Sequence, residues 1–152
     1  MPARDTIHEA IVEALESSGW IITADPFVLL FEEHHLFVDI AARSTRQVES
    51  QWVAAARGAR RIAVEIKAFP GPSAISDLYR AIGQFVVYNL ALREVEPLRD
   101  LFLAVSSDVF DELFSDGIGR LVLQRLPLRM LVVDLDTREV VEWIEPDSTG
   151  TP

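Results

Sequence analysis

The sequence contains no cysteine in its 152 residues, and only one of its 14 basic residues is a lysine. The first absence excludes disulfides and thiolate zinc sites, so any metal must be held by oxygen or imidazole ligands. The second makes Lys67 unusual, because this chain otherwise uses arginine wherever it carries a positive charge. A retained lysine indicates a position that needs a compact, strongly hydrated ammonium in place of a planar guanidinium.

Long apolar runs are also absent. No stretch approaches the ~18 apolar residues of a membrane span, and residues 1–5 lack the apolar region of a signal peptide. We therefore expect a cytoplasmic protein that makes no membrane contact. Its length predicts one domain over residues 1–145, followed by a disordered tail over 146–152.

Positive charge is scarce overall, because 24 acidic residues against 14 basic ones give a formal net charge of −10. This balance argues against a passive nucleic-acid coat protein. Residues 43–67 are different, with six basic and two acidic residues and hence a net charge of +4. Five arginines there are candidates for phosphate contacts, unless they only cover a solvated loop: Arg43, Arg46, Arg57, Arg60 and Arg61.

Periodicity and turn signals predict a mixed α/β fold. We expect helices at 6–18, 73–94, 108–114 and 118–126. We expect strands at 20–24, 27–31, 36–41, 61–67, 101–105, 128–133 and 139–144. A hairpin loop at 32–35 would contain His34 and His35, and a loop with a short helix would occupy 43–58.

The expected strand 61–67 is the one around which the chain is organised. Apolar and other residues alternate along it, so its three branched apolar side chains should face a core. Glu65 and Lys67 are two apart and therefore share the opposite face. A solvated ion pair on a half-exposed strand would explain them equally well if they are considered alone.

Asp39 interrupts a nearly continuous apolar run in the expected strand 36–41. A buried carboxylate without a partner is costly, so Asp39 needs a donor or a cation. If neighbouring strands bring Asp39 and Glu65 together, the two carboxylates would hold a hard divalent cation, preferably Mg²⁺ or Mn²⁺. Lys67 would then lie beside an attacking water, an arrangement that suits phosphodiester hydrolysis.

Two helices contribute further candidates. Glu9 and His8 lie in the first turns of the first expected helix, and Gln84 and Tyr88 share one face of the long one because they are four apart. His8 and Tyr88 are possible supporting residues. Each of the four is also explained as an ordinary helix residue, Glu9 as a favourable charge near a helix N-terminus.

With Asp39 and the tripeptide Glu65-Ile66-Lys67, the chain resembles the PD-(D/E)xK nuclease superfamily. The resemblance implies a restriction-endonuclease-like core over residues 5–106, with a mixed central sheet flanked by helices. It implies metal binding by both carboxylates, catalysis by the lysine, a supporting role for Gln84 and completion of the metal shell by Glu9. Valine precedes Asp39 where the motif has proline.

Short motifs along nearly the whole chain carry a narrower resemblance: Pro2–Asp5 with His8, Gly19-Trp20, Asp25-Pro26, Ala63–Lys67, Gly71–Ser76 and Gly83–Phe85. On the basis of these motifs, the chain is similar to the XisH family. Its members, the fdxN-element excision controlling factors, assist programmed DNA excision by a recombinase in filamentous cyanobacteria. The resemblance implies a companion protein of the XisI type.

Two functions are compatible with these observations. One is a metal-dependent DNA endonuclease or junction-processing enzyme that supports element excision. The other is a non-catalytic regulator that keeps the nuclease fold and docks a XisI-like protein or a recombinase. A homodimer is compatible with both. The sequence leaves open the DNA substrate, the oligomeric state and whether metal is bound at rest.

Overall fold

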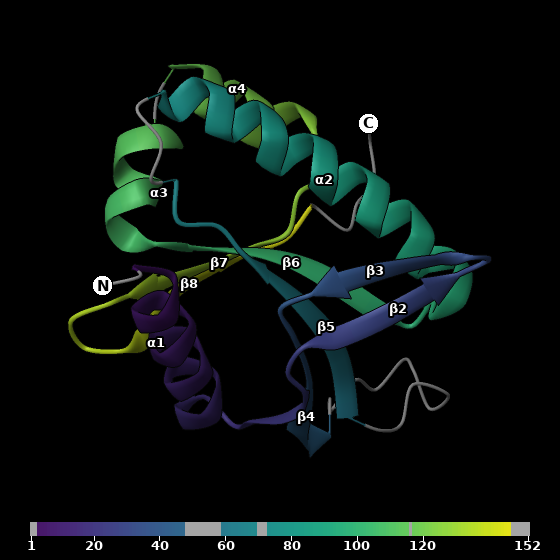
Figure 1. Ribbon diagram of the computed structural model, residues 1–152. Coiled ribbons are helices and arrows are strands. Elements are labelled where there is room, and N and C mark those ends of the chain that lie inside the picture. The colour runs from purple at the N-terminus through teal and green to yellow at the C-terminus, as the bar shows by residue number, and fades with distance from the viewer. Residues whose placement is uncertain (1–2, 48–58, 70–72, 116, 147–152) are drawn as a thin grey trace.

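The computed structural model describes residues 3–47, 59–69, 73–115 and 117–146. They form a mixed six-stranded sheet with helices on both faces (Figure 1). The helices are α1 (Ala3–Ser17), α2 (Ala74–Val95), α3 (Ser107–Leu113) and α4 (Gly117–Arg125). The strands are β1 (Trp20–Ala24), β2 (Phe27–Phe31), β3 (His34–Val38), β4 (Ile40–Gln47), β5 (Ala59–Ile66), β6 (Arg99–Ser106), β7 (Met130–Asp134) and β8 (Glu139–Ile144).

The sheet has the strand order β1-β4-β5-β6-β7-β8, with β5 near its centre. β1, β4 and β5 pair antiparallel, β5, β6 and β7 pair parallel, and β8 closes the far edge antiparallel to β7. Parallel neighbours need a long crossover, and α2 provides it between β5 and β6. The mixed α/β fold predicted from the sequence is thus confirmed.

Two apolar layers hold the sheet between its helices. α1 buries Ile7, Ile11, Ala14 and Leu15 against one face, to which β5 contributes its branched apolar residues. α2, α3, α4 and the β2–β3 hairpin cover the other face. Burying one Leu or Ile side chain contributes about 1.5–3 kcal/mol, so these two layers fix which side of β5 faces which helix.

The expected strand 36–41 is in fact two strands that belong to different sheets. β3 pairs only with β2 among the described residues, whereas β4 enters the main sheet between β1 and β5. The break falls at Asp39. β4 also continues to Gln47, so the expected loop from residue 43 was wrong over its first five residues, because pairing with β1 and β5 overrides their weak strand pattern.

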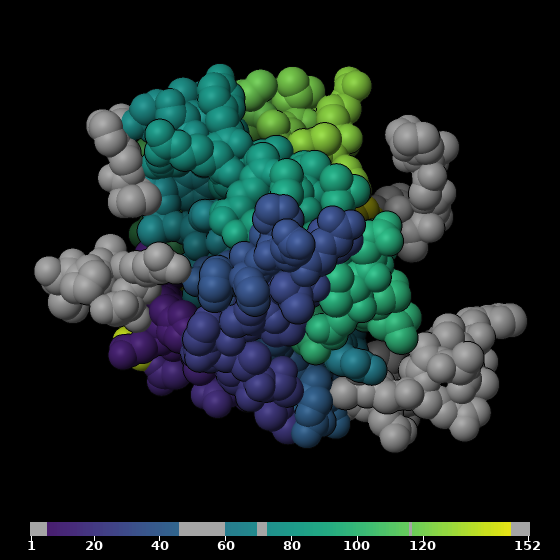
Figure 2. Space-filling model, turned by 45° about the vertical axis from the view of Figure 1, so that its right-hand side comes forward, coloured from purple at the N-terminus to yellow at the C-terminus, as the bar shows by residue number. Residues whose placement is uncertain are grey.

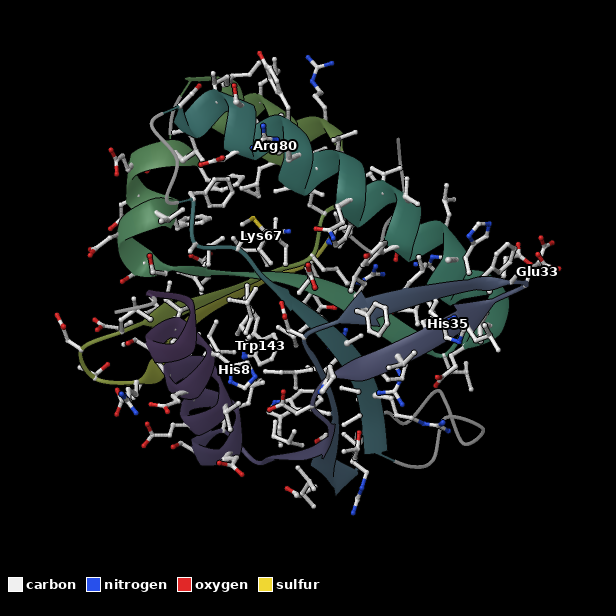
Figure 3. The ribbon with its side chains drawn as sticks, viewed as in Figure 1. His8, Glu33, His35, Lys67, Arg80 and Trp143 are labelled. Carbon is white, nitrogen blue, oxygen red and sulfur yellow. The ribbon has the colours of Figure 1, made fainter. Side chains whose placement is uncertain are left out.

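The hairpin turn is shorter than expected. Phe31 pairs with His34, which leaves Glu32 and Glu33 as a two-residue turn, and Glu32 has a positive φ of 54°. His34 and His35 are therefore strand residues of β3, not loop residues. Both are exposed, and His35 lies near the hairpin tip (Figure 3).

No helix among the described residues is long and apolar enough to span a bilayer. The expected short helix near Trp52 and the end of the chain, 147–152, lie outside the described residues.

Candidate functional site

Asp39 lies at the bend between β3 and β4, where the chain passes from the hairpin into the main sheet. Its Oδ2 accepts a hydrogen bond from the backbone N–H of Ile66 at 2.7 Å. Ile66 is the last residue of β5, so this bond fixes Asp39 beside Glu65 at the carboxyl end of the central strand. The expectation that this carboxylate needs a partner is confirmed.

Glu65 and Lys67 lie together, as their spacing predicts. Glu65 Oε2 is 3.4 Å from Lys67 Nζ, and the Glu65 side chain is only 10 % exposed. The backbone N–H of Lys67 donates to the Ala104 carbonyl at 3.0 Å, which extends the pairing of β5 with β6 by one residue. Lys67 lies between α2 and the sheet (Figure 3). The structure therefore brings Asp39, Glu65 and Lys67 to one place.

Glu65 holds its proton more tightly than an ordinary glutamate. Burial raises the pKa of Glu65 to about 7, the negative charge of Asp39 adds to this rise, and the ammonium of Lys67 opposes it. A protonated Glu65 can also donate a hydrogen bond to Asp39, which raises the pKa further. The proximity of the two carboxyl groups therefore contributes to the raised pKa of Glu65.

When Glu65 is ionised, the carboxylate pair places two negative charges side by side, with the Lys67 ammonium next to them. In the part of the chain that the structure describes, Glu65 Oε1 is buried without a hydrogen-bond partner. A buried oxygen in this state favours a bound proton or a bound cation. The residues present therefore fit a hard divalent cation held by two carboxylates, with its remaining positions open to water and substrate oxygens.

No third protein ligand joins the pair in the part of the chain that the structure describes. Among the described residues, no group of three His, Asp or Glu side chains is placed to hold a metal ion. Glu9 is exposed on α1 and lines a shallow hollow of about 410 Å³ with Asp25 and Arg138. The implied completion of the metal shell by Glu9 is not what the structure shows, because α1 packs on the opposite face of the sheet from Glu65.

His8 lines the same hollow as Glu9 and contacts Asp25. Its Nε2 lies 2.9 Å from Asp25 Oδ1, in a half-exposed pair that joins α1 to the turn after β1. His8 and Lys67 lie on different sides of the sheet in Figure 3. The local partner of His8 is thus an acidic turn residue that the sequence suggested only as a turn signal.

Gln84 and Tyr88 are half-buried on α2. Tyr88 packs against the apolar layer that includes Leu78 and Phe85, so its first role is in the core. Gln84 is one helical turn before it, on the same flank of α2. A role for Gln84 in supporting Lys67 stays a prediction.

The five candidate phosphate-binding arginines divide into three groups. Arg43 and Arg61 are exposed and lie directly opposite each other across β4 and β5. Like charges in this position repel, so an anion between them would be stabilising. Arg61 is on the same face of β5 as Glu65, four residues earlier. The side chain of Arg46, and all of Arg57, lie outside the described residues.

Arg60 forms its own group because it is already paired. It lies 3.0 Å from Asp100 and contacts Glu145, and its guanidinium stacks 5.4 Å from the centre of the Phe102 ring. The Glu145 hydrogen bond is the largest of the contributions that raise its pKa. Arg60 is therefore paired within the fold at the other end of β5, and its role as a possible DNA contact stays a prediction.

Comparison with known proteins gives these residues a family. The model of the XisH protein family matches residues 1–141. The chain belongs to the XisH family. A crystal structure of an XisH family protein from Nostoc punctiforme is similar to it, with a TM-score of 0.79 and 32 % identity over 93 % of this chain and 100 % of that one.

A second XisH relative carries a functional name. The crystal structure of an fdxN element excision controlling factor from Anabaena variabilis has a TM-score of 0.78 and 36 % identity, over 93 % of this chain and all of its own. No curated protein matches this chain. The XisH resemblance inferred from short motifs is confirmed.

Sequence reasoning missed the groups that hold the site in place. The Ile66 amide that binds Asp39 is 27 residues away, and Asp25 is 17 residues from His8. No periodic pattern connects residues at such distances. The one available signal was energetic, since a carboxylate in an apolar run requires a donor.

Proposed function

We propose that this XisH protein is a metal-dependent phosphodiester hydrolase that acts on DNA during element excision, with a PD-(D/E)xK-type site. The observation that carries the proposal is the convergence of Asp39, Glu65 and Lys67 at the end of β5. Two carboxylates and one ammonium at the carboxyl end of a central strand are the groups that such hydrolysis needs.

The carboxylate pair would hold Mg²⁺ or Mn²⁺. Mg²⁺ in phosphoryl-transfer sites is commonly bound through one or two carboxylates while its other positions hold water and phosphate oxygens. When bound, the ion would polarise the phosphate and lower the pKa of a water at the site. Glu65 Oε1 supports this assignment, because it has no hydrogen-bond partner within the described residues and a cation would supply the missing interaction.

Lys67 would orient the reacting groups. Its ammonium is held by Glu65 at 3.4 Å and by a backbone that continues the β5–β6 ladder. It has two further N–H donors that can hold an attacking water or a phosphate oxygen. A compact ammonium allows this close approach, which explains why the chain keeps a lysine at this one position.

Arg43 and Arg61 are exposed cations on the face of β4 and β5 that carries Glu65, and they would contact backbone phosphates away from the scissile one. With a net charge of −10, the rest of the surface repels DNA and would restrict binding to this region.

The test is cleavage of linear, nicked and branched DNA by the purified full chain with Mg²⁺ or Mn²⁺. Asp39→Asn and Glu65→Gln should each abolish cleavage, whereas Glu142→Gln, at an exposed carboxylate on β8, should not. Absence of cleavage of every substrate, or equal cleavage by wild type and Asp39→Asn, would reject the hydrolase.

A second function, a non-catalytic regulator that docks a XisI-like protein or a recombinase, is favoured by one observation. The described residues supply two carboxylate ligands and no third. A site of this kind can persist as a structural remnant in a protein that works by binding. In that case, Asp39→Asn would leave excision in cells unchanged, whereas the hydrolase requires that excision fail.

A further inference from the structure

Helix α2 exposes an apolar stripe on the side that faces away from the sheet. Its buried side, which includes Leu78, Phe85 and Leu92, packs into the core. Four large apolar side chains on the other side are 42 to 66 % exposed: Tyr79, Val86, Val87 and Leu90. An apolar stripe along a 22-residue surface helix is typical of a surface that another element covers.

A gap lies in the middle of this stripe. Gly83 is four residues after Tyr79 and seven before Leu90, so all three lie on one side of the helix. A Cβ atom at Gly83 would meet nothing within 4 Å apart from its chain neighbours and the backbone of its own helix. Glycine in a helix interior lowers helix stability relative to alanine, and nothing in the described fold requires it here. The gap is therefore free to receive a side chain from outside.

We propose that α2 docks against α2 of a second copy of this chain, antiparallel, with the two-fold axis close to Val87. This arrangement goes beyond the proposed hydrolase and does not depend on it. Gly83 lies four residues before Val87 and Leu90 three residues after it, so the two are at nearly the same distance from the axis. Leu90 of each copy would thus fill the gap at Gly83 of the other, a close contact that small residues permit between helices.

Charge supports a second copy as the occupant. Arg80 and Glu94 lie on the same flank of α2 as Val87, seven residues to either side of it. An antiparallel two-fold pairing places Arg80 opposite Glu94 of the second copy, and does so twice. The Arg80 side chain projects from α2 and is 83 % exposed, with Asp77 of its own helix 3.9 Å away (Figure 3).

The surface next to the stripe would enlarge the contact. α2 and the β2–β3 hairpin lie side by side on one face of the molecule (Figure 2). The hairpin exposes three further apolar side chains, Val28, Leu30 and Phe37. A stable dimer buries about 800 Å² on each partner, which is more than one helix stripe provides. The hairpin would supply the remainder.

Sedimentation of the purified full chain over a range of concentrations tests the dimer. Wild type should dimerise. Val87→Glu should raise the dimer dissociation constant by at least about 30-fold, because a two-fold dimer contains each substitution twice. Val141→Glu, at an exposed valine on β8, is the matched control and should not change it. Gly83→Leu should also separate the copies, while its melting temperature stays equal or rises because the position is open.

Exchange of charges separates this arrangement from other contacts through the same stripe. Arg80→Glu alone should weaken the dimer, and Arg80→Glu with Glu94→Arg should restore it. A wild-type chain that stays monomeric, including one that binds a different protein through the stripe, overturns the proposal. A dimer that is indifferent to Val87→Glu and Gly83→Leu overturns it as well.

Discussion

The amino end of β5 carries Arg60, and its carboxyl end carries Glu65, with Lys67 just beyond. Both ends hold half-buried or buried charges, yet their balance differs. Arg60 and Arg129 lie within 4 Å of two carboxylates, Asp100 and Glu145, so positive and negative charges match. This cluster pairs its charges inside the fold, although Arg129 Nε has no hydrogen-bond partner among the described residues.

The carboxyl end differs because two carboxyl groups lie next to each other there. Glu65 Oε1 has no hydrogen-bond partner among the described residues, and the pKa of Glu65 rises to about 7 through burial and the charge of Asp39. Both ends lie on the same strand, so strand geometry alone does not produce the difference. Paired opposite charges are typical of a structural role, whereas two buried carboxyl groups side by side, one with a raised pKa, are typical of a functional site, which is what we propose for the carboxyl end.

The largest expected effect comes from Lys67→Arg. If Lys67 orients the reacting groups, the planar and bulkier guanidinium should lower DNA cleavage on the order of 100-fold or more. Thermal unfolding should change by less than about 0.5 kcal/mol, because the charge and the strand are kept. Equal cleavage rates for the variant and wild type would make the lone lysine an accident of composition.

Breaking the balanced end should affect stability alone. Arg60→Met leaves Asp100 and Glu145 with Arg129 as their remaining partner, and should cost about 1–2 kcal/mol of unfolding free energy, since the side chain is partly screened by solvent. Chemical denaturation measures this loss. Mn²⁺ affinity should stay within twofold of wild type. A large loss of metal affinity would show that the two ends are coupled.

Neutralising Glu65 should increase stability at neutral and higher pH, the opposite of the effect at Arg60. Between the ordinary glutamate pKa of 4.5 and the raised value of about 7, the folded chain keeps a proton that the unfolded chain has released. Stability of the metal-free protein should therefore fall as pH rises through this window and level off above it.

Glu65→Gln cannot lose this proton, so the variant should not show the fall. At pH 8 without metal, it should be more stable than wild type by on the order of 1–2 kcal/mol. Denaturation of both proteins at pH 4.5, 6 and 8 measures the difference. If Glu65→Gln were less stable than wild type at pH 8, ionised Glu65 would contribute more to stability than its burial costs. That result would contradict this prediction.

The smallest effect is expected at the exposed arginines. Arg43→Gln and Arg61→Gln should each weaken DNA binding several-fold and reduce its salt dependence by about one phosphate contact. Arg125→Gln on α4 is a control for loss of one exposed charge. Fluorescence anisotropy with Ca²⁺ in place of Mg²⁺ measures binding without cleavage. If all three variants lost the same amount of DNA affinity, the effect would come from net charge and not from phosphate contacts at Arg43 and Arg61.

Local patterns predicted most of the fold. The alternation around Glu65 identified β5 and its faces, and the caps and stripes of α1 and α2 placed both helices within a few residues. The site followed from the same pattern and from the cost of burying Asp39. Both arguments use only neighbours in sequence and the properties of single side chains.

The remaining features depend on contacts between distant residues. β4 extends to Gln47 because β1 and β5 flank it, and the strand breaks at Asp39 because that side chain binds the Ile66 amide. Arg60 and Arg61 are the same residue type, yet they lie on opposite faces of β5 because side chains alternate along a strand. Arg60 therefore contacts Phe102 and Glu145. Such partners are set by topology, which a single sequence does not specify.

Calorimetric titration with Mn²⁺ at pH 7 tests the central claim most directly, because it asks whether the carboxylate pair at the end of β5 binds a cation. Wild type should bind one ion and release protons from Glu65, so the heat should depend on the buffer. Asp39→Asn should weaken binding at least about 10-fold, since it removes one of two charged ligands, and Glu142→Gln should not. Equal binding by wild type and Asp39→Asn, or no binding by wild type, would contradict the account.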